Sequence, residues 1–177
     1  LHNEFFENQI KHLNLFVVGV GNVGGQLIEQ IAAQEEYLLE KLQLKVNVVA
    51  LSNSKKMLFR ESGIDLSDWK NDLLDNGVTL NLDKFHANVV DFNLANSIFV
   101  DNTANYDIAQ LYAGYLKESI AVVTCNKIAA SSDYEIYAEL KSLSREYNAP
   151  YLFETNVGAG LPIINTLNNL VLSGDNI

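Results

Sequence analysis

The sequence predicts a doubly wound α/β domain with a mostly parallel sheet, and three observations support this. Short apolar runs rich in β-branched residues recur along the 177 residues, and helical patterns separate them. Such alternation indicates right-handed βαβ crossovers that cover a sheet on both faces. A glycine-rich turn lies between the first expected strand and the first expected helix. With 48% hydrophobic residues and only 2 Pro, the composition is typical of a folded domain.

The first expected strand, residues 15–20, is a continuous apolar run, which indicates burial on both faces. An apolar stripe at helical spacing follows, made of Leu27, Ile28, Ile31, Leu38, Leu39 and Leu42. Further strands are expected at residues 46–51, 98–100, 120–124 and 151–153. Further helices are expected at residues 68–74, 106–117, 134–147 and 162–172. Residues 52–90 are the least regular part, and a weakly amphipathic stretch at 82–89 stays unassigned.

The overall charge and the single cysteine exclude several classes of protein. With 12 Lys and Arg against 22 Asp and Glu, the formal net charge is −10, so we expect no nucleic-acid partner and no attraction to anionic membrane. No apolar run approaches the roughly 20 residues needed to cross a bilayer. Cys125 is the only cysteine, which excludes an intrachain disulfide and favours a reducing, cytoplasmic compartment. We interpret Cys125 as a small buried hydrophobe.

Residues 19–24 read GVGNVG, a G-x-G-x-x-G motif placed between an expected strand and an expected helix. The first glycine permits a tight turn, the second lets the backbone approach a pyrophosphate, and the third lets helix and strand pack closely. The N–H groups of the helix N-terminus then face the phosphates. The motif predicts dinucleotide binding, and the alternative is a glycine-rich turn without a ligand. The expected cofactor contacts here are Gly19, Gly21, Asn22, Val23 and Gly24.

The end of the second expected strand predicts which dinucleotide is preferred. NAD-binding sites usually carry Asp or Glu there, whereas residues 50–56 read ALSNSKK and contain no acid. Hydroxyl, amide and ammonium groups suit the 2′-phosphate of NADP(H) better than the ribose diol of NAD(H). We therefore expect NADP(H) to be preferred, with NAD(H) as the weaker cofactor. The expected contacts are Ser52, Asn53, Ser54 and Lys55. The alternative is a solvated loop whose lysines contact nothing.

Polar residues follow the later strands, at the edge where ligands bind in open α/β sheets. We expect Thr103 and Asn126 to hydrogen-bond the nicotinamide half of a cofactor. Lys127 is a candidate to meet a carbonyl or hydroxyl at the reacting carbon, and an ordinary surface lysine is the alternative. Residues 154–162 read ETNVGAGLP. Their backbone carbonyls and Glu154 are candidate ligands for a hard cation, because such ions take oxygen ligands.

Four segments together resemble the homoserine dehydrogenases. They are VVGVGNVGG at 17–25, VDNT at 100–103, VVTCNK at 122–127 and TNVGAGLP at 155–162. Residues 1–6 and 50–55 are most similar to the bifunctional bacterial aspartokinase/homoserine dehydrogenases. The resemblance implies a Rossmann-like NAD(P)-binding domain and the NAD(P)-dependent interconversion of aspartate 4-semialdehyde and homoserine, on the route to threonine and methionine.

The same resemblance implies roles for particular residues. It places Lys127 at the reaction centre and Thr103 beside the cofactor. It also implies a monovalent cation, sodium, near Glu154, Val157, Ala159 and Leu161. Two departures are visible: Cys125 stands where Pro or Ala is commoner, and Asn102 stands where Cys is common. Neither departure removes an expected functional group.

A domain layout follows from the resemblance. We expect residues 1–12 to lead in from a preceding domain and residues 13–177 to form the NAD(P)-binding domain. A substrate domain is expected elsewhere in a full-length, homo-oligomeric enzyme, so the 177-residue chain alone is expected to be inactive. A non-catalytic dinucleotide-sensing module and a Rossmann dehydrogenase of another substrate stay open as alternatives. Lys127 is either a proton donor or a cation that stabilises an oxyanion.

Overall fold

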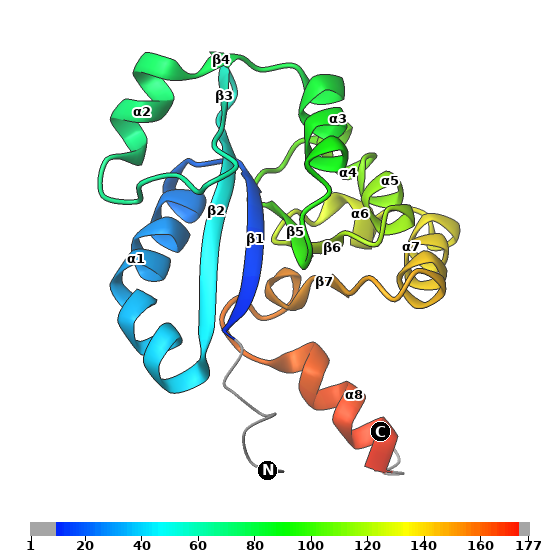
Figure 1. Ribbon diagram of the computed structural model, residues 1–177. Coiled ribbons are helices and arrows are strands. Elements are labelled where there is room, and N and C mark those ends of the chain that lie inside the picture. Colours follow the sequence, from blue (N-terminus) through cyan, green and yellow to red (C-terminus); the bar gives the residue numbers. More distant parts are fainter. Residues whose placement is uncertain (1–9, 174–177) are drawn as a thin grey trace, which may run out of the picture. The chain divides into compact units, whose positions relative to one another are not determined.

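The structure is a computed structural model that describes residues 10–173, and the chain divides into two compact units. The first unit ends at Phe99 and the second begins at Val100. The boundary falls within strand β5 (Ser97–Asp101), which therefore contributes to both units. Figure 1 shows the strands and helices of each unit in the order of the sequence.

The first unit begins with β1 (Lys11–Val18), α1 (Asn22–Leu42) and β2 (Leu44–Ser52). The two strands are parallel, and they pair from Lys11 opposite Leu44 to Val18 opposite Ser52. Their apolar centres are fully buried at Phe16, Val17, Val49 and Leu51. This arrangement confirms the first βα crossover, although β1 begins at Lys11, four residues before the expected start of the strand. Of the expected lead-in segment, residues 1–12, the first nine lie outside the described residues, and Lys11 and His12 belong to β1.

The irregular part of the sequence folds into β3 (Lys56–Phe59), α2 (Trp69–Asn76), β4 (Val78–Thr79) and α3 (Leu82–Phe92). A tight turn makes β3 possible, because the Asn53 side chain accepts hydrogen bonds from the backbone N–H groups of Lys55 and Lys56. The chain then runs back antiparallel to β2. The weakly amphipathic stretch becomes α3, whose N-terminus is capped by Asn81. In this unit α1 and α2 lie on one side of the strands and α3 on the other (Figure 1).

The second unit carries α4 (Tyr106–Ala109), α5 (Tyr112–Lys117), β6 (Ala121–Thr124), α6 (Ile128–Ser131), α7 (Tyr134–Glu146) and β7 (Tyr151–Leu152). A 3₁₀ turn, η1 (Glu154–Asn156), and α8 (Ile163–Ser173) follow. One expectation is wrong here: residues 106–117 form two short helices instead of one. The α-helical hydrogen-bond pattern is interrupted because the N–H of Leu111 donates to the carbonyl oxygen of Ile108, three residues back instead of four.

Hydrogen-bonded neighbours in the sheet follow the order β4-β3-β2-β1-β5 in the first unit and β5-β6-β7 in the second. The β1/β2 and β6/β7 pairs are parallel, whereas β3 and β4 are antiparallel. The expected mostly parallel, doubly wound α/β fold is confirmed, with an antiparallel edge that the sequence did not predict. Between residues 10 and 173, no helix has the length and apolar character that crossing a bilayer requires.

Candidate functional site

The glycine loop joins β1 to α1, and the end of β2 holds it in place. The N–H groups of Gly19 and Val20 both donate to the carbonyl oxygen of Ser52, at 2.9 and 3.1 Å. Gly19 has a φ of 88°, a left-handed value that favours glycine. Gly21 is the N-cap of α1, and a Cβ atom built there would meet no atom within 4 Å. The first N–H groups of α1, which have no intrahelical acceptor, therefore border open space suited to an anion.

The segment after β2 presents hydroxyl, amide and ammonium groups as expected. Some of these groups already have hydrogen-bond partners within the chain, and others do not. Ser52 is buried, and its Oγ has no hydrogen-bond partner among residues 10–173. The Asn53 carbonyl oxygen is used by the turn into β3. Ser54 and Lys55 are exposed. The side chain of Lys55 makes no hydrogen bond or ion pair within the described part of the chain, so its ammonium is available to a ligand.

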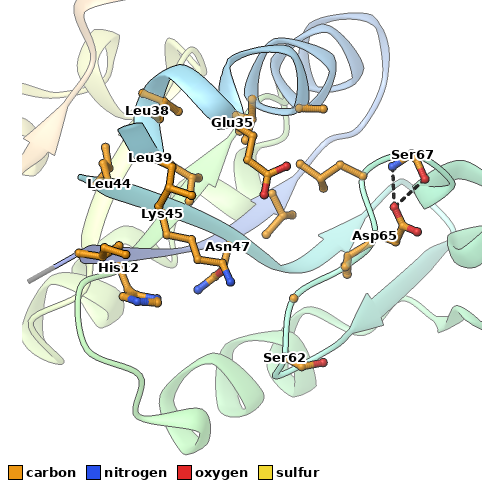
Figure 2. Close-up of a pocket in the computed structure, with 18 residues that line it drawn as sticks. His12, Glu35, Leu38, Leu39, Leu44, Lys45, Asn47, Ser62, Asp65 and Ser67 are labelled. Atoms are coloured by element: carbon orange, nitrogen blue, oxygen red, sulfur yellow. Dashed lines mark hydrogen bonds between the residues drawn. The ribbon is translucent and has the colours of Figure 1, made fainter. Parts of the chain in front are cut away.

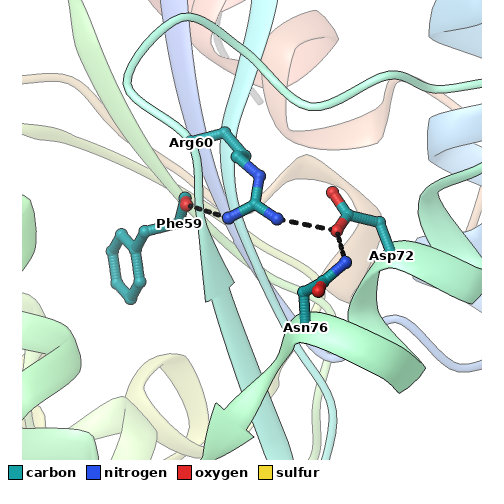
Figure 3. Close-up of polar contacts among 4 residues, drawn as sticks. All are labelled: Phe59, Arg60, Asp72 and Asn76. Carbon is teal, nitrogen blue, oxygen red and sulfur yellow. Dashed lines mark hydrogen bonds and ion pairs between the residues drawn. The ribbon is translucent and has the colours of Figure 1, made fainter.

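Two other cations near this segment are committed to internal contacts. The Lys56 ammonium donates to the carbonyl oxygen of Leu74 in α2. The Arg60 guanidinium forms an ion pair with Asp72 at 2.8 Å and also donates to the carbonyl oxygen of Phe59 at 3.3 Å (Figure 3). These contacts give Arg60 a structural role. Lys55 is therefore the better candidate for contact with a 2′-phosphate.

In the second unit, a buried carboxylate lies at the end of β5. Asp101 has no exposed surface. Its Oδ1 accepts a hydrogen bond from the N–H of Thr103 at 2.7 Å. Its Oδ2 accepts from the hydroxyl of Tyr112 at 2.5 Å and from Nδ2 of Asn126 at 3.0 Å. Asp101 is not among the site residues predicted from the sequence, although an acid that ends an apolar strand is a signal the sequence contains.

Asn126, which was expected to contact the nicotinamide half directly, is bonded internally through every polar group. Its Nδ2 donates to Asp101 and to the carbonyl oxygen of Asn105, and its Oδ1 accepts from the N–H of Ile128. Its backbone N–H donates to Thr124 Oγ1, and its carbonyl oxygen accepts from Asn156 Nδ2. With only 1% of its surface exposed, Asn126 is arranged to hold neighbouring segments in place.

The two neighbours of this network remain accessible. Thr103 is half-buried, and its hydroxyl oxygen accepts from the N–H of Asn105 at 3.1 Å, which leaves its O–H donor for another group. Lys127 is exposed and precedes the first residue of α6. Cys125 lies two residues before Lys127 in the sequence. Burial raises the pKa of its thiol, and the negative charge of the Asp101 carboxylate raises it further. The neutral thiol is therefore favoured. Cys125 was expected to be a small buried hydrophobe, but its side chain is only partly buried.

The candidate cation loop precedes α8, and its one acid is already engaged. Glu154 accepts from the N–H of Ile164 at 2.8 Å through Oε1 and from the N–H of Asn165 at 3.0 Å through Oε2. Gly158 and Ala159 both have positive φ values, 72° and 51°. Within residues 10–173 no group of three or more His, Cys, Asp or Glu side chains is placed to hold a metal ion. Any cation here would depend mainly on backbone oxygens.

The first unit contains a cavity of about 860 Å³ (Figure 2). Its lining includes His12 and Lys45, at the starts of β1 and β2, together with Leu38 and Leu39 of α1. Since the glycine loop follows the end of β1, this cavity lies at the opposite ends of the same strands. None of the expected cofactor contacts lines it, so it is not the predicted dinucleotide site.

Comparison with known proteins decides the family. The family model of the homoserine dehydrogenase NAD-binding domain matches residues 19–154. The chain belongs to this family. It is 43% identical to a bifunctional aspartokinase/homoserine dehydrogenase of Haemophilus influenzae, over 99% of the chain and 21% of that protein. It is 39% identical to a homoserine dehydrogenase of Schizosaccharomyces pombe, over 94% of the chain and 44% of that protein.

Solved structures agree with this assignment to the homoserine dehydrogenase NAD-binding domains. A hyperthermophilic archaeal homoserine dehydrogenase mutant in complex with NADPH has a TM-score of 0.72 and 28% identity, over 90% of this chain and 49% of that one. The chain spans about a fifth of the length of the bifunctional relatives that it matches. The motif segments that carried the resemblance thus identified the family from the sequence.

Proposed function

We propose that this chain is the cofactor-binding domain of an enzyme that interconverts aspartate 4-semialdehyde and homoserine, acting as a cytoplasmic homo-oligomer. The observation that carries the proposal is the family match over residues 19–154. Two features of the chain support it: the glycine loop borders open space at Gly21, and polar side chains follow β5 and β6, as a dehydrogenase requires. A purely sensing module has no need of an exposed Lys127 beside a buried hydrogen-bond network.

The preferred cofactor in this proposal is NADP(H). The acid-free segment after β2 and the free ammonium of Lys55 support this preference, since a carboxylate there would repel a 2′-phosphate. The archaeal relative that was solved with NADPH is consistent with it. We assign the pyrophosphate to the glycine loop at Gly19, Gly21, Asn22, Val23 and Gly24. The N–H groups of residues 21–24 are the donors, because the N–H of Gly19 already bonds to the carbonyl oxygen of Ser52. We assign the 2′-phosphate to Ser52, Asn53, Ser54 and Lys55.

The chemistry divides between the cofactor and the residues of the chain. When bound, the nicotinamide supplies the hydride transfer, and the protein supplies orientation and charge. Lys127 is the residue of this chain that we assign to the reacting carbonyl, where it either donates a proton or stabilises the developing alkoxide as a cation. The hydroxyl of Thr103, whose donor is unused, is assigned to the nicotinamide half.

We also propose a sodium ion at the loop before α8, held largely by the backbone oxygens of Val157, Ala159 and Leu161. Glu154 is the nearest acid in sequence, and its carboxylate already bonds two N–H groups of α8. Its contribution in this proposal is to fix the loop and to add negative charge near the ion. A hard, weakly charged cation suits such a set of neutral oxygens.

Calorimetric titration of the chain with NADPH and NADH tests the central part of this proposal. We expect saturable binding of NADPH at one site per chain and weaker binding of NADH. Binding of neither dinucleotide would contradict the proposed function as a whole. Equal affinity for both would contradict only the preference for NADP(H).

A further inference from the structure

We propose that Asp101 is a positioning residue for the nicotinamide half of the cofactor: one buried carboxylate sets the arrangement of the loops that carry Thr103 and Lys127. This inference rests on the proposed function and deepens it, because it names the residue that fixes the two loops expected to contact the nicotinamide. Asp101 itself is fully buried and is not expected to touch the cofactor.

The carboxylate of Asp101 is costly to bury. A carboxylate removed from water is strongly destabilising unless hydrogen bonds or an opposite charge satisfy it. The two ion pairs among the described residues, Arg60–Asp72 and Lys70–Glu29, do not involve Asp101. Its compensation comes instead from the three donors of Thr103, Tyr112 and Asn126. Such a carboxylate holds in place the segments that carry its donors, because losing any one of these hydrogen bonds leaves the buried charge with fewer partners and costs free energy.

The three donors come from three different segments of the second unit. The N–H of Thr103 belongs to the loop after β5, so one carboxylate oxygen fixes the turn that presents the Thr103 hydroxyl. The other oxygen holds Asn126 in the loop after β6. Asn126 in turn accepts from the N–H of Ile128, which closes the turn around Lys127. The Asp101 side chain thus fixes the backbone conformation of both loops that carry the candidate nicotinamide contacts, Thr103 and Lys127.

Tyr112 completes the arrangement from α5. Its hydroxyl lies 2.5 Å from Asp101 Oδ2 and 2.8 Å from Thr124 Oγ1, within a fully buried environment. Burial, together with the charge of Asp101, raises the pKa of Tyr112, so the hydroxyl keeps its proton and can act as a donor to the carboxylate at all physiological pH values. Tyr112 therefore restrains the carboxylate rather than competing with it.

The test compares two ligands that differ only in the nicotinamide: NADPH and 2′-phospho-ADP-ribose. Their affinity ratio in the unmodified chain measures what the nicotinamide half contributes. In Asp101→Asn the amide places N–H groups against Asn126 Nδ2, and we expect the ratio to fall at least fivefold while the affinity for 2′-phospho-ADP-ribose changes less than twofold. A general loss of folding would lower both affinities together and leave the ratio unchanged.

Tyr112→Phe is the milder variant, in case Asp101→Asn does not fold. It should lower the same ratio about twofold to fivefold. The matched control is Tyr151→Phe, because the Tyr151 hydroxyl is also buried in the second unit and has no hydrogen-bond partner among the described residues. That control should leave the ratio unchanged, and thermal unfolding of each variant reports its stability.

The outcomes separate this inference from the proposed function. If the unmodified chain binds neither ligand, the proposed function fails. If it binds both with equal affinity, or if Asp101→Asn and Tyr112→Phe keep the unmodified ratio, the dinucleotide site stands and the positioning role of Asp101 is overturned. An equal effect of Tyr151→Phe and Tyr112→Phe also overturns it, because the effect then comes from loss of any buried hydroxyl.

Discussion

The carboxylate of Glu154 caps helix α8 by accepting the N–H of Ile164 at 2.8 Å, and it accepts the N–H of Asn165 at 3.0 Å with its second oxygen. An anion at a helix N-terminus satisfies donors that have no intrahelical acceptor and interacts favourably with the helix dipole. The ten-residue separation in sequence means that this contact also closes the loop between them. Glu154 therefore links the candidate cation loop to the stability of α8.

Glu154→Gln tests this link. The variant loses the charge and one of the two acceptors, so we expect amides 164 and 165 to exchange hydrogen faster, with a loss of about 1 kcal/mol of local stability. Hydrogen exchange resolved at single residues measures the effect. Glu139→Gln on α7 is the matched control, since Glu139 is exposed and makes no hydrogen bond or ion pair within the described residues. Equal exchange in both variants would contradict the capping role.

Replacing choline chloride with sodium chloride should slow exchange in this loop only if the proposed ion binds.

Gly21→Ala separates the fold of the glycine loop from its proposed ligand. A Cβ atom at Gly21 meets no atom within 4 Å, although the ψ of −145° lies outside the extended region that alanine prefers. We therefore expect a loss in stability of about 1 to 3 kcal/mol, from the alanine N-cap and the backbone strain, with the domain still folded. The added methyl projects into the space assigned to the pyrophosphate, so NADPH affinity should fall at least tenfold. Fluorescence titration of NADPH and thermal unfolding measure the two effects.

Gly160→Ala serves as the control for that experiment. A Cβ atom at Gly160 also meets nothing within 4 Å, and this glycine lies outside the glycine loop. It should leave NADPH affinity unchanged. If Gly21→Ala binds NADPH as tightly as the control does, the alternative of a glycine turn without a ligand is the better interpretation.

Lys55→Glu should reduce or reverse the preference for NADPH over NADH. The ammonium of Lys55 is exposed and unbonded within the described residues, whereas Lys56 and Arg60 are engaged elsewhere. A carboxylate at position 55 repels a 2′-phosphate but can accept from a ribose hydroxyl, so the ratio of affinities should fall roughly tenfold. Isothermal titration with both dinucleotides measures it.

Lys45→Glu makes the same change of charge at the other end of β2. Since a strand of this length spans about 27 Å, well beyond the Debye length of about 10 Å at 0.1 M salt, the control should leave the ratio intact. A similar fall in both variants would show a general effect of net charge and would count against a specific contact by Lys55.

The sequence was sufficient for the features that depend on local pattern. The apolar runs located β1, β2 and β6 to within a few residues, and the glycine motif located the β1–α1 junction. Roles that depend on distant partners were not predictable in this way. The Asn126 amide donates to Asp101, 25 residues earlier in the sequence, and the Arg60 guanidinium forms an ion pair with Asp72 of the next helix. Strand β3 was missed because it has only four residues and its pairing depends on the turn at Asn53.

Alkaline pH should destabilise the protein through its buried tyrosines. Burial, with a smaller effect of Tyr137, raises the pKa of Tyr151 to about 12, and burial also raises the pKa values of Tyr112 and Tyr115. In the unfolded chain these groups ionise near pH 10. Between pH 10 and 12 the unfolded state therefore releases protons that the folded state retains, and stability falls with rising pH.

The expected slope is about 1.4 kcal/mol per pH unit for each such tyrosine. Urea unfolding at intervals from pH 8 to pH 11.5 measures it, and tyrosinate absorbance reports which groups have ionised. Tyr151→Phe should make the fall of the unfolding free energy with pH shallower above pH 10. Below pH 9, where tyrosines are not ionised in either state, the substitution should not change the pH dependence of stability. Constant stability up to pH 11.5 would show that these hydroxyls ionise without opening the fold.

Lys127→Ala, made in a full-length enzyme that contains this chain, should lower turnover with homoserine by roughly 10²-fold or more while cofactor affinity changes little. The two effects should separate because Lys127 follows β6, whereas the pyrophosphate is assigned to the glycine loop after β1. Lys127→Arg distinguishes the two roles that the sequence left open. Arginine keeps the positive charge but is a poor proton donor at neutral pH. Substantial recovery of turnover by arginine would indicate electrostatic stabilisation of the oxyanion, and little recovery would indicate proton donation. Unchanged turnover in Lys127→Ala would show that Lys127 is an ordinary surface lysine, and the assignment of the reacting end to the loop after β6 would fail with it.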